Sequence, residues 1–244
     1  MPSKLLTFDQ QDSTILTPQT QSEASGSVET FDRFGNSIGT VEFTNMDEVV
    51  PCFTPGTVIA TPRGERLVED LVVGDKVITR DNGIQEIRWF GKKYLDERAL
   101  TNNVHLRPVL IRAGAMGNGL PERDMLVSPN HRMLVANDQT ALYFEEREVL
   151  ASAKHIVNNK GITAVATAGM TYIHFMFDNH EVVLGNGAWT ESFQPGDKSL
   201  EGIGNAQRTE ILEIFPELKT SEGLDAYPSA RKTLVKHEAQ LLVR

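Results

Sequence analysis

The sequence predicts an all-β fold built from many short strands, with a short helical extension at its C-terminal end. Short apolar segments recur through the middle of the chain, and turn signals rich in Gly, Pro, Asn and Asp separate them. Patterns typical of helices come only late in the chain. Hydrophobic residues make up 40% of the sequence and charged residues 23%, which is typical of a soluble globular protein.

One hairpin is expected near the start of the chain, where residues 28–31 and 38–43 flank the turn Phe34-Gly35-Asn36-Ser37. The strands expected in the middle are residues 57–60, 67–71, 76–79, 85–89, 109–112, 125–127, 133–135, 162–165, 171–177 and 181–184.

Two helices are expected in the last part of the chain. The first covers residues 209–215 and ends at Pro216, because proline cannot continue a helix. The second covers residues 229–242, is amphipathic, and has Ser229 in the position of an N-cap.

Length, charge and cysteine content exclude several classes of protein. A chain of 244 residues fits one domain with extensions, or two small domains. The net charge of −9 argues against a protein that binds nucleic acid or an anionic membrane. The single cysteine, Cys52, excludes an internal disulfide and any multi-cysteine metal site. No apolar run reaches ~20 residues and the start lacks a signal peptide, so we expect a soluble protein, cytoplasmic or exported without a signal.

The negative charge is unevenly distributed along the chain. Residues 1–51 carry two basic and eight acidic residues, which is −6 of the total −9. The same segment is rich in Gln, Ser and Thr, and its one hairpin could bury little apolar surface. We therefore interpret residues 1–51 as an acidic leader.

Cys52 lies where the leader ends, in the segment Pro51-Cys52-Phe53-Thr54-Pro55-Gly56-Thr57. A lone cysteine is most often a small buried hydrophobic residue. Here the Pro-Gly turn that follows holds the thiol at the edge of an element rather than in mid-strand. This position favours a chemical role for the thiol.

The segment Ser128-Pro129-Asn130-His131 is typical of a type I β-turn, which brings its first and last residues within ~7 Å at Cα. Ser128 and His131 are therefore expected to share one site, where a hydroxyl and an imidazole could orient an amide and deliver a proton to it. The alternative is a capping serine beside an exposed turn histidine.

A third group of polar residues follows the strand expected at residues 171–177. Strand alternation puts His174, Asp178 and His180 on one face and apolar residues on the other. A metal site could be read into this group, but the polar face of a strand is polar by default. We therefore expect no metal and no other cofactor, although the carboxylate could tune a neighbouring histidine.

Together these segments resemble the Hint superfamily, the autoprocessing domains of inteins, hedgehog proteins and related bacterial proteins. Residues 52–57 are similar to its nucleophile block, and residues 67–77 to the hairpin that follows. Ser128-Pro129-Asn130-His131 is similar to the Thr-x-x-His block, with Ser in place of Thr, and residues 180–187 to the C-terminal His block. The resemblance covers residues 52–193 and is strongest to bacterial Hint domains. It implies that residues 194–244 are an extension packed on that domain.

The resemblance implies a peptide-bond rearrangement at Pro51–Cys52. Cys52 would attack the carbonyl of Pro51 to form a thioester, Ser128 would hold the amide, and His131 would protonate the departing nitrogen. An acid would assist the second step, and the resemblance suggests Asp96, with Asp178 and His180 as rivals. The substrate would be the chain's own N-terminal segment, with water or a small nucleophile as the second reactant.

Departures from the family pattern point to cleavage rather than splicing. No Asn is placed to cyclise at the end of the His block, and no second cysteine lies downstream. We expect single-turnover release of the leader. The alternatives are an inactive Hint-fold module with a structural or interaction role, and a Cys–His hydrolase acting in trans.

Overall fold

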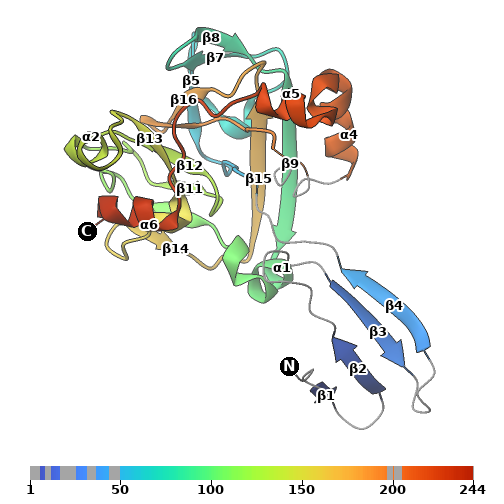
Figure 1. Ribbon diagram of the computed structural model, residues 1–244. Helices are drawn as coiled ribbons and strands as arrows, with labels where there is room; N and C mark the ends of the chain where they lie inside the picture. The colour runs from blue at the N-terminus through green and yellow to red at the C-terminus, as the bar shows by residue number, and fades with distance from the viewer. Residues whose placement is uncertain are drawn as a thin grey trace. The chain divides into compact units, whose positions relative to one another are not determined.

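The computed structural model describes the backbone of residues 6–8, 12–16, 26–31 and 37–43, and then residues 50–196, 200 and 205–243 (Figure 1). The chain divides into two compact units, Met1–Glu48 and Val49–Arg244.

The first unit contains an antiparallel sheet in the order β1-β2-β3-β4. Its strands are β1 Leu6–Phe8, β2 Asp12–Leu16, β3 Gly26–Phe31 and β4 Ser37–Phe43. Strands β3 and β4 pair antiparallel, which confirms the hairpin expected there.

The second unit is mostly β-structure, as the sequence predicts. Its strands are β5 Val58–Thr61, β6 Gly64–Leu67, β7 Lys76–Thr79, β8 Gly83–Glu86, β9 Trp89–Asp96, β10 Val109–Ile111, β11 Met125–Val127, β12 Arg132–Val135, β13 Val149–Ser152, β14 Ile162–Ala164, β15 Gly169–Met176, β16 Val182–Gly185 and β17 Ala188–Glu191.

The helical segments of this unit are short. The α-helices are α1 Glu97–Asn102, α2 Asp138–Phe144, α4 Asn205–Ile214, α5 Ser221–Asp225 and α6 Lys236–Ala239. The 3₁₀ turns are η1 Val68–Asp70, η2 Val104–Leu106, η3 Ala153–His155, η4 Pro216–Lys219 and η5 Gln240–Val243.

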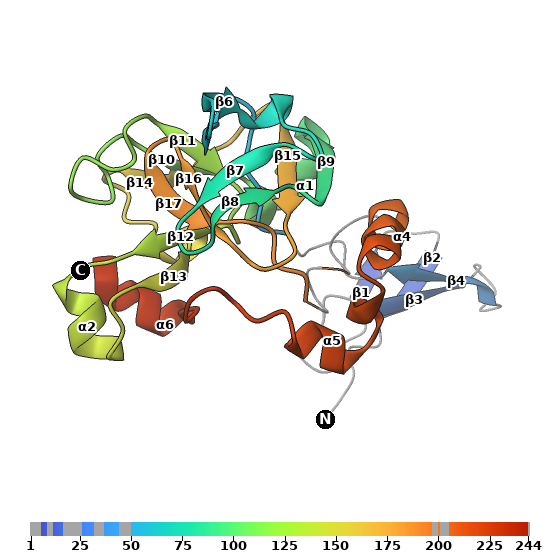
Figure 2. The same cartoon turned by 90° about the horizontal axis from the view of Figure 1, so that it is seen from above.

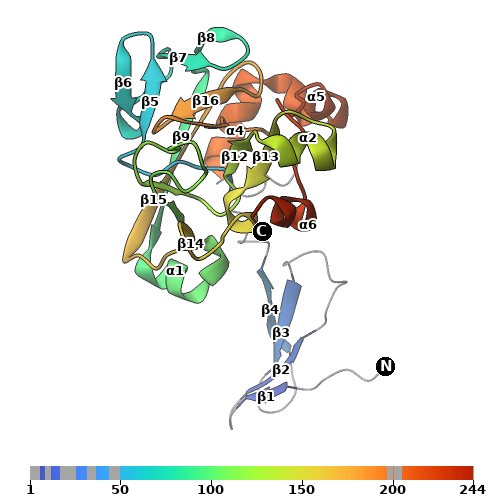
Figure 3. The ribbon, with the colours of Figure 1, turned by 90° about the vertical axis from the view of Figure 1, so that its left-hand side faces the viewer.

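Three sheets organise the second unit. An eight-stranded sheet has the order β13-β12-β17-β16-β5-β6, and β7 joins it by pairing with β16 and β8. A three-stranded sheet has the order β11-β10-β14. The long strands β9 and β15 pair with each other over eight residues, and α1 lies at one end of this ribbon (Figures 1 and 3).

Apolar side chains from all three sheets contribute to the main apolar cluster of the unit. Strand alternation explains the pattern, since Ile59 in β5 and Val77 in β7 point inward while their neighbours are half-buried or exposed. Phe53 stacks on Phe175 at the centre, with ring centroids 5.3 Å apart. Burying one such ring contributes about 1.5–3 kcal/mol, so this core fixes the strand ends that carry polar side chains.

Two expected strands differ in the structure. Of the strand expected at residues 67–71, only Leu67 belongs to β6, and the residues that follow form η1. Val68 and Leu71 are both buried, and their i, i+3 spacing suits a 3₁₀ turn. The segment 85–89 is split between β8 and β9. The backbone of Ile87 leaves the ladder to bond with Gly74 and Asp75.

The expected helix at 209–215 is present but begins earlier, as α4, and ends before Pro216 as predicted. The helix expected at 229–242 is wrong over its first half. The backbone of Lys232 and Leu234 bonds to Leu150, so the segment lies extended beside β13 (Figure 2). Ser229 is therefore not a helix cap, and the helix begins only at α6.

No helix among the described residues is both long and apolar enough to cross a membrane.

Candidate functional site

The backbone around Cys52 is held between two sheets. Phe53 forms isolated bridges with Val127 and with Ile173 of β15. Its N–H donates to the Ile173 carbonyl at 2.7 Å, and the Ile173 N–H donates back at 2.9 Å. Cys52 itself is only 2% exposed. The Pro51–Cys52 peptide bond is therefore a fixed part of the protein interior.

The Ser128–His131 turn forms as expected, with the His131 N–H donating to the Ser128 carbonyl at 3.1 Å. The Ser128 hydroxyl accepts the Cys52 N–H at 2.9 Å and donates to the Val50 carbonyl at 2.9 Å. The Ser128 N–H also donates to the Cys52 carbonyl at 3.0 Å. Ser128 thus forms hydrogen bonds with the N–H and the carbonyl of Cys52 and with the carbonyl of Val50.

The Cys52 thiol has two polar neighbours, a carbonyl oxygen that accepts its hydrogen bond and a histidine nitrogen that can act as a base. Its Sγ lies 2.9 Å from the Val50 carbonyl oxygen and 3.2 Å from His174 Nδ1. Burial raises the pKa of the Cys52 thiol far above its ordinary value, and the Ser128 hydrogen bond and the charge of Lys93 oppose this only in part. The thiol is therefore neutral, and it would need a base in order to act as a nucleophile.

His174 sits in an aromatic cage. Its ring stacks on Trp89 with centroids 5.0 Å apart and lies 5.6 Å from the Phe193 ring. Burial lowers the pKa of His174 to about 3, and the charge of Lys93 adds to this effect. The imidazole is therefore neutral near pH 7, and a neutral Nδ1 that carries a lone pair can accept the thiol proton.

His131 is also buried, and burial lowers its pKa to about 4. The Thr190 hydroxyl donates to the Arg132 carbonyl at 2.9 Å, so the short contact between His131 Nε2 and that hydroxyl requires His131 to donate. His131 Nδ1 then carries the lone pair, and it has no hydrogen-bond partner among the described residues. His131 is thus a neutral imidazole, which can donate a proton from Nδ1 only after gaining one.

His180 lies in a separate polar group behind this turn. Its Nε2 is 3.3 Å from Glu191 Oε2, and both side chains are fully buried. Glu191 also accepts from the Arg132 N–H at 2.7 Å and from Arg132 Nη1 at 3.1 Å. Since Arg132 follows His131 and Glu191 follows Thr190, this group borders His131 through the β12–β17 pair.

The structure does not bring Asp96 or Asp178 to Cys52. Asp96 caps α1 by accepting the Ala99 N–H at 2.7 Å. It pairs with Gly169, five residues along the ribbon from the Gly91–His174 pair, about 17 Å at the usual rise per residue. Asp178 is 63% exposed and pairs with Arg88 at 3.3 Å. The shared face expected for His174, Asp178 and His180 is wrong, because β15 ends at Met176.

Two buried polar residues of the site were not among the expected site residues. His174 was noted as one of three polar residues on a strand, but nothing in the sequence spacing relates it to a cysteine 122 positions away. Glu191 directly follows Thr190 in β17, a strand that was not expected. The burial of Glu191 depends on the packing of β17, so the sequence offered no signal for this residue.

The chain matches the family model described as "Hint domain" over residues 51–197. No curated protein sequence matches the chain.

Three solved structures illustrate the similarity. The bacterial intein-like domain from Clostridium thermocellum has 13% identity and a TM-score of 0.39, covering 59% of this chain and 99% of that one. The MchDnaB-1 intein (N145AA) has 11% identity and a TM-score of 0.38, covering 58% and 98%. A DnaB intein from Synechocystis sp. PCC 6803 has 11% identity and a TM-score of 0.33, covering 58% and 98%.

Proposed function

The chain belongs to the Hint domain family, and on that premise we propose that it cleaves itself once at Pro51–Cys52 and releases its N-terminal leader without splicing. The observation that carries this proposal is the geometry around Ser128. Its hydroxyl accepts the N–H of the bond to be broken and also holds the Val50 carbonyl, which fixes that bond on both sides.

In the first step, Cys52 Sγ attacks the carbonyl carbon of Pro51 while the thiol proton moves to His174 Nδ1, 3.2 Å away. His174 is available for this role because its buried ring is neutral near pH 7, and its low pKa means that it gives up the transferred proton readily. The aromatic cage keeps the imidazole in place during the transfer.

In the second step, the bond between the Pro51 carbonyl carbon and the Cys52 nitrogen breaks, and the nitrogen gains a proton. The net change moves one proton from the thiol to the nitrogen, so a thioester and a free amine form. Ser128 contacts the leaving nitrogen directly, and we assign the protonation of that nitrogen to His131, three residues away in the same turn. His131 Nδ1 takes up one proton from solvent for this step, and His174 releases the proton of the thiol to solvent, so the protons balance. An imidazolium whose pKa is about 4 releases its proton readily to an amine.

In the last step, water or another nucleophile attacks the thioester. With water, the products are the carboxylate of Pro51 and the regenerated Cys52 thiol. The sequence after the His block has no Asn positioned to cyclise and no second cysteine, so we propose no ligation.

The test is a chain tagged at both ends and followed on a denaturing gel, with and without hydroxylamine or a strong thiol. We expect a leader fragment from the unmodified chain, and its loss in Cys52→Ala. Replacement of His174 or His131 by Ala should slow the release, whereas the matched His237→Ala, at an exposed position, should not. An intact chain after prolonged incubation with thiol contradicts the proposal.

A second candidate is an inactive Hint-fold module. Burial of Cys52 favours it, because a buried neutral thiol in a closed site is also what a structural cysteine looks like. The two candidates are separated by measuring both the free energy of unfolding of Cys52→Ala and the release of the leader fragment. If Cys52→Ala changes only stability and no condition yields a leader fragment, the structural role stands.

A further inference from the structure

The segment 229–235, here called the strap, runs along the edge of the eight-stranded sheet. It pairs in parallel with β13 through Thr233 and Leu150. The Leu150 N–H donates to the Lys232 carbonyl at 2.9 Å, and the Leu234 N–H donates to the Leu150 carbonyl at 2.8 Å. These bonds fix the register of the strap on the domain.

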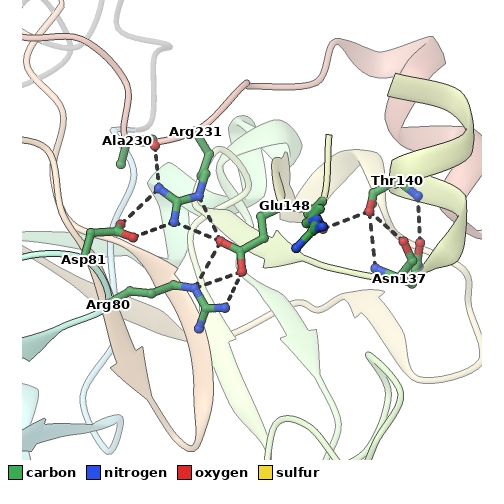
Figure 4. Close-up of polar contacts among 8 residues, drawn as sticks. Arg80, Asp81, Asn137, Thr140, Glu148, Ala230 and Arg231 are labelled. Atoms are coloured by element: carbon green, nitrogen blue, oxygen red, sulfur yellow. Dashed lines mark hydrogen bonds and ion pairs between the residues drawn. The ribbon is translucent and has the colours of Figure 1, made fainter. Parts of the chain in front are cut away.

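Arg231 anchors the strap through two carboxylates (Figure 4). Its two Nη atoms bond the Asp81 oxygens at 3.0 and 2.7 Å, and its Nε donates to Glu148 Oε2 at 2.9 Å. Arg80 binds the same Glu148 from the other side and, as the first cause, holds the pKa of Glu148 below its ordinary value. Because the planar guanidinium group of Arg231 bonds two carboxylates at once, it has little freedom to rotate.

The residue next to this anchor touches the site. The Ala230 N–H donates to His180 Nδ1 at 2.9 Å, and the His180 side chain is fully buried. A nitrogen that accepts a hydrogen bond carries no proton, so the proton of the neutral ring lies on Nε2. His180 Nε2 lies 3.3 Å from Glu191 Oε2, within ion-pair distance, although it makes no hydrogen bond to the described residues. Glu191 in turn accepts hydrogen bonds from Arg132, the residue after His131.

We propose that Arg231 is a positioning residue of the processing site: it holds the strap so that the Ala230 N–H fixes His180 as the Nε2–H tautomer, with Nε2 beside Glu191. Because His180 lies beside Glu191, the strap also holds the Glu191–Arg132 pair in place. That pair joins β17 to β12, and His131 directly precedes β12. Its effect on cleavage rests on the proposed function of His131, whereas its effect on the His180 tautomer does not.

The test is ¹⁵N NMR of the histidine side chains in the full chain, with Cys52→Ala present so that the chain stays intact. In this background we expect His180 to show an unprotonated Nδ1 and a protonated Nε2. Arg231→Gln should abolish this single tautomer, and Arg231→Lys, which keeps the charge but not the fork, should weaken it. The control Arg63→Gln, at an exposed arginine, should leave it unchanged.

A protonated Nδ1 on His180 with Arg231 intact overturns the proposal. The proposal is also overturned if both Arg231 variants show the same His180 tautomer as the unmodified residue. If Arg231→Gln does not fold, the tautomer can still be measured in Arg231→Lys.

Cleavage is the second readout, measured with Cys52 intact. Arg231→Gln should slow leader release about fivefold to tenfold, the size of one lost hydrogen bond, and an unchanged rate contradicts the link to His131. If the unmodified chain never releases its leader, the proposed function fails, while the NMR result still decides the positioning role.

Discussion

At the scale of single residues, the packing around His174 leaves no space for a side chain at the position opposite it on the paired strand. Gly91 lies opposite His174, and a Cβ added there would come within 2.6 Å of His174 Nε2 and 2.6 Å of the Trp89 ring. Neither ring is at the free end of a flexible chain, since the two stack on each other. Only glycine leaves room for the imidazole to reach the thiol.

Gly91→Ala is therefore expected to displace His174 and slow the first step of leader release, followed as fragment yield over time. The control is the same substitution in a His174→Ala background, where nothing remains to be displaced. A double-mutant cycle measures the coupling, which we expect to exceed about 0.5 kcal/mol, the usual threshold for residues in contact. Additive effects of the two substitutions would falsify this assignment.

Val50 gives a second prediction at this scale. Its side chain is 4% exposed, in the same apolar cluster as Trp89 and Phe193, and its carbonyl accepts from both Cys52 and Ser128. Val50→Asp would bury a charge without a partner, which costs several kcal/mol. We expect loss of leader release, measured on the gel, and near-normal release in Val50→Ile. Equal rates of leader release in the two variants would contradict the view that the buried side chain of Val50 is needed for cleavage.

The residues that could be predicted from sequence are those whose partners are close in the chain. Turn chemistry alone places Ser128 and His131 together, and Cys52 precedes a Pro-Gly turn that marks an element edge. His174 could not be related to Cys52, because their contact depends on the register of β15 against Phe53. That register is set by long-range packing of Phe53, Ile173 and Phe175, which local propensity does not encode.

At the scale of elements, the C-terminal helices cover the cluster around the thiol. Gln207 of α4 donates to the Lys92 carbonyl at 3.0 Å, and the Trp89 indole donates to Glu210 at 3.1 Å, so α4 packs along β9 (Figure 1). Ile211 and Phe215 belong to the same apolar cluster as Cys52. The ring that stacks on His174 is thus also held by α4.

Helix α4 offers a matched pair of substitutions. Ile211 is fully buried, whereas Ile214 on the same helix is 40% exposed. Ile211→Asp should detach α4 and raise the rate at which iodoacetamide alkylates Cys52, and Ile214→Asp should not. The chain has one cysteine, so intact mass reports this thiol alone. Wild-type alkylation as fast as in denaturant would contradict a covered thiol.

Sequence patterns predict strands well here and their ends poorly. Most expected strands of the middle region appear within a few residues, because turn residues such as Gly74 and Gly83 punctuate them. The strap was expected to be helical because its apolar residues recur at helical spacing. It lies extended because pairing with β13 satisfies its backbone, and that competition is decided by tertiary contacts.

At the scale of the whole molecule, two buried histidines link stability to pH. Burial lowers the pKa of His131 to about 4 and of His174 to about 3, while an unfolded chain titrates them near about 6.5. The unfolded state therefore binds more protons than the folded state between these values. Their contribution to stability is complete above about pH 6.5, is lost progressively as the pH falls below that value, and is fully lost once the pH has passed the two lower values.

The urea midpoint should accordingly fall between pH 7 and pH 5. His174→Gln removes one of the two groups, so the fall should be shallower in that variant, whatever its absolute stability. His237→Gln, at an exposed position, serves as the control. Parallel midpoint curves for His174→Gln and the unmodified chain contradict the linkage.

The Val50 carbonyl has a further consequence for the molecule as a whole. It belongs to the segment that the proposed cleavage would remove, yet it is the acceptor for two buried donors of the domain that would remain. Its departure would leave the Ser128 hydroxyl without this acceptor, at a cost of about 1–3 kcal/mol, and would put a new ammonium at Cys52 in place of a neutral amide. If the proposed cleavage occurs, the domain therefore loses hydrogen-bond partners that its own leader supplies, and we expect the cleaved domain to be less stable than the intact chain and unable to react a second time.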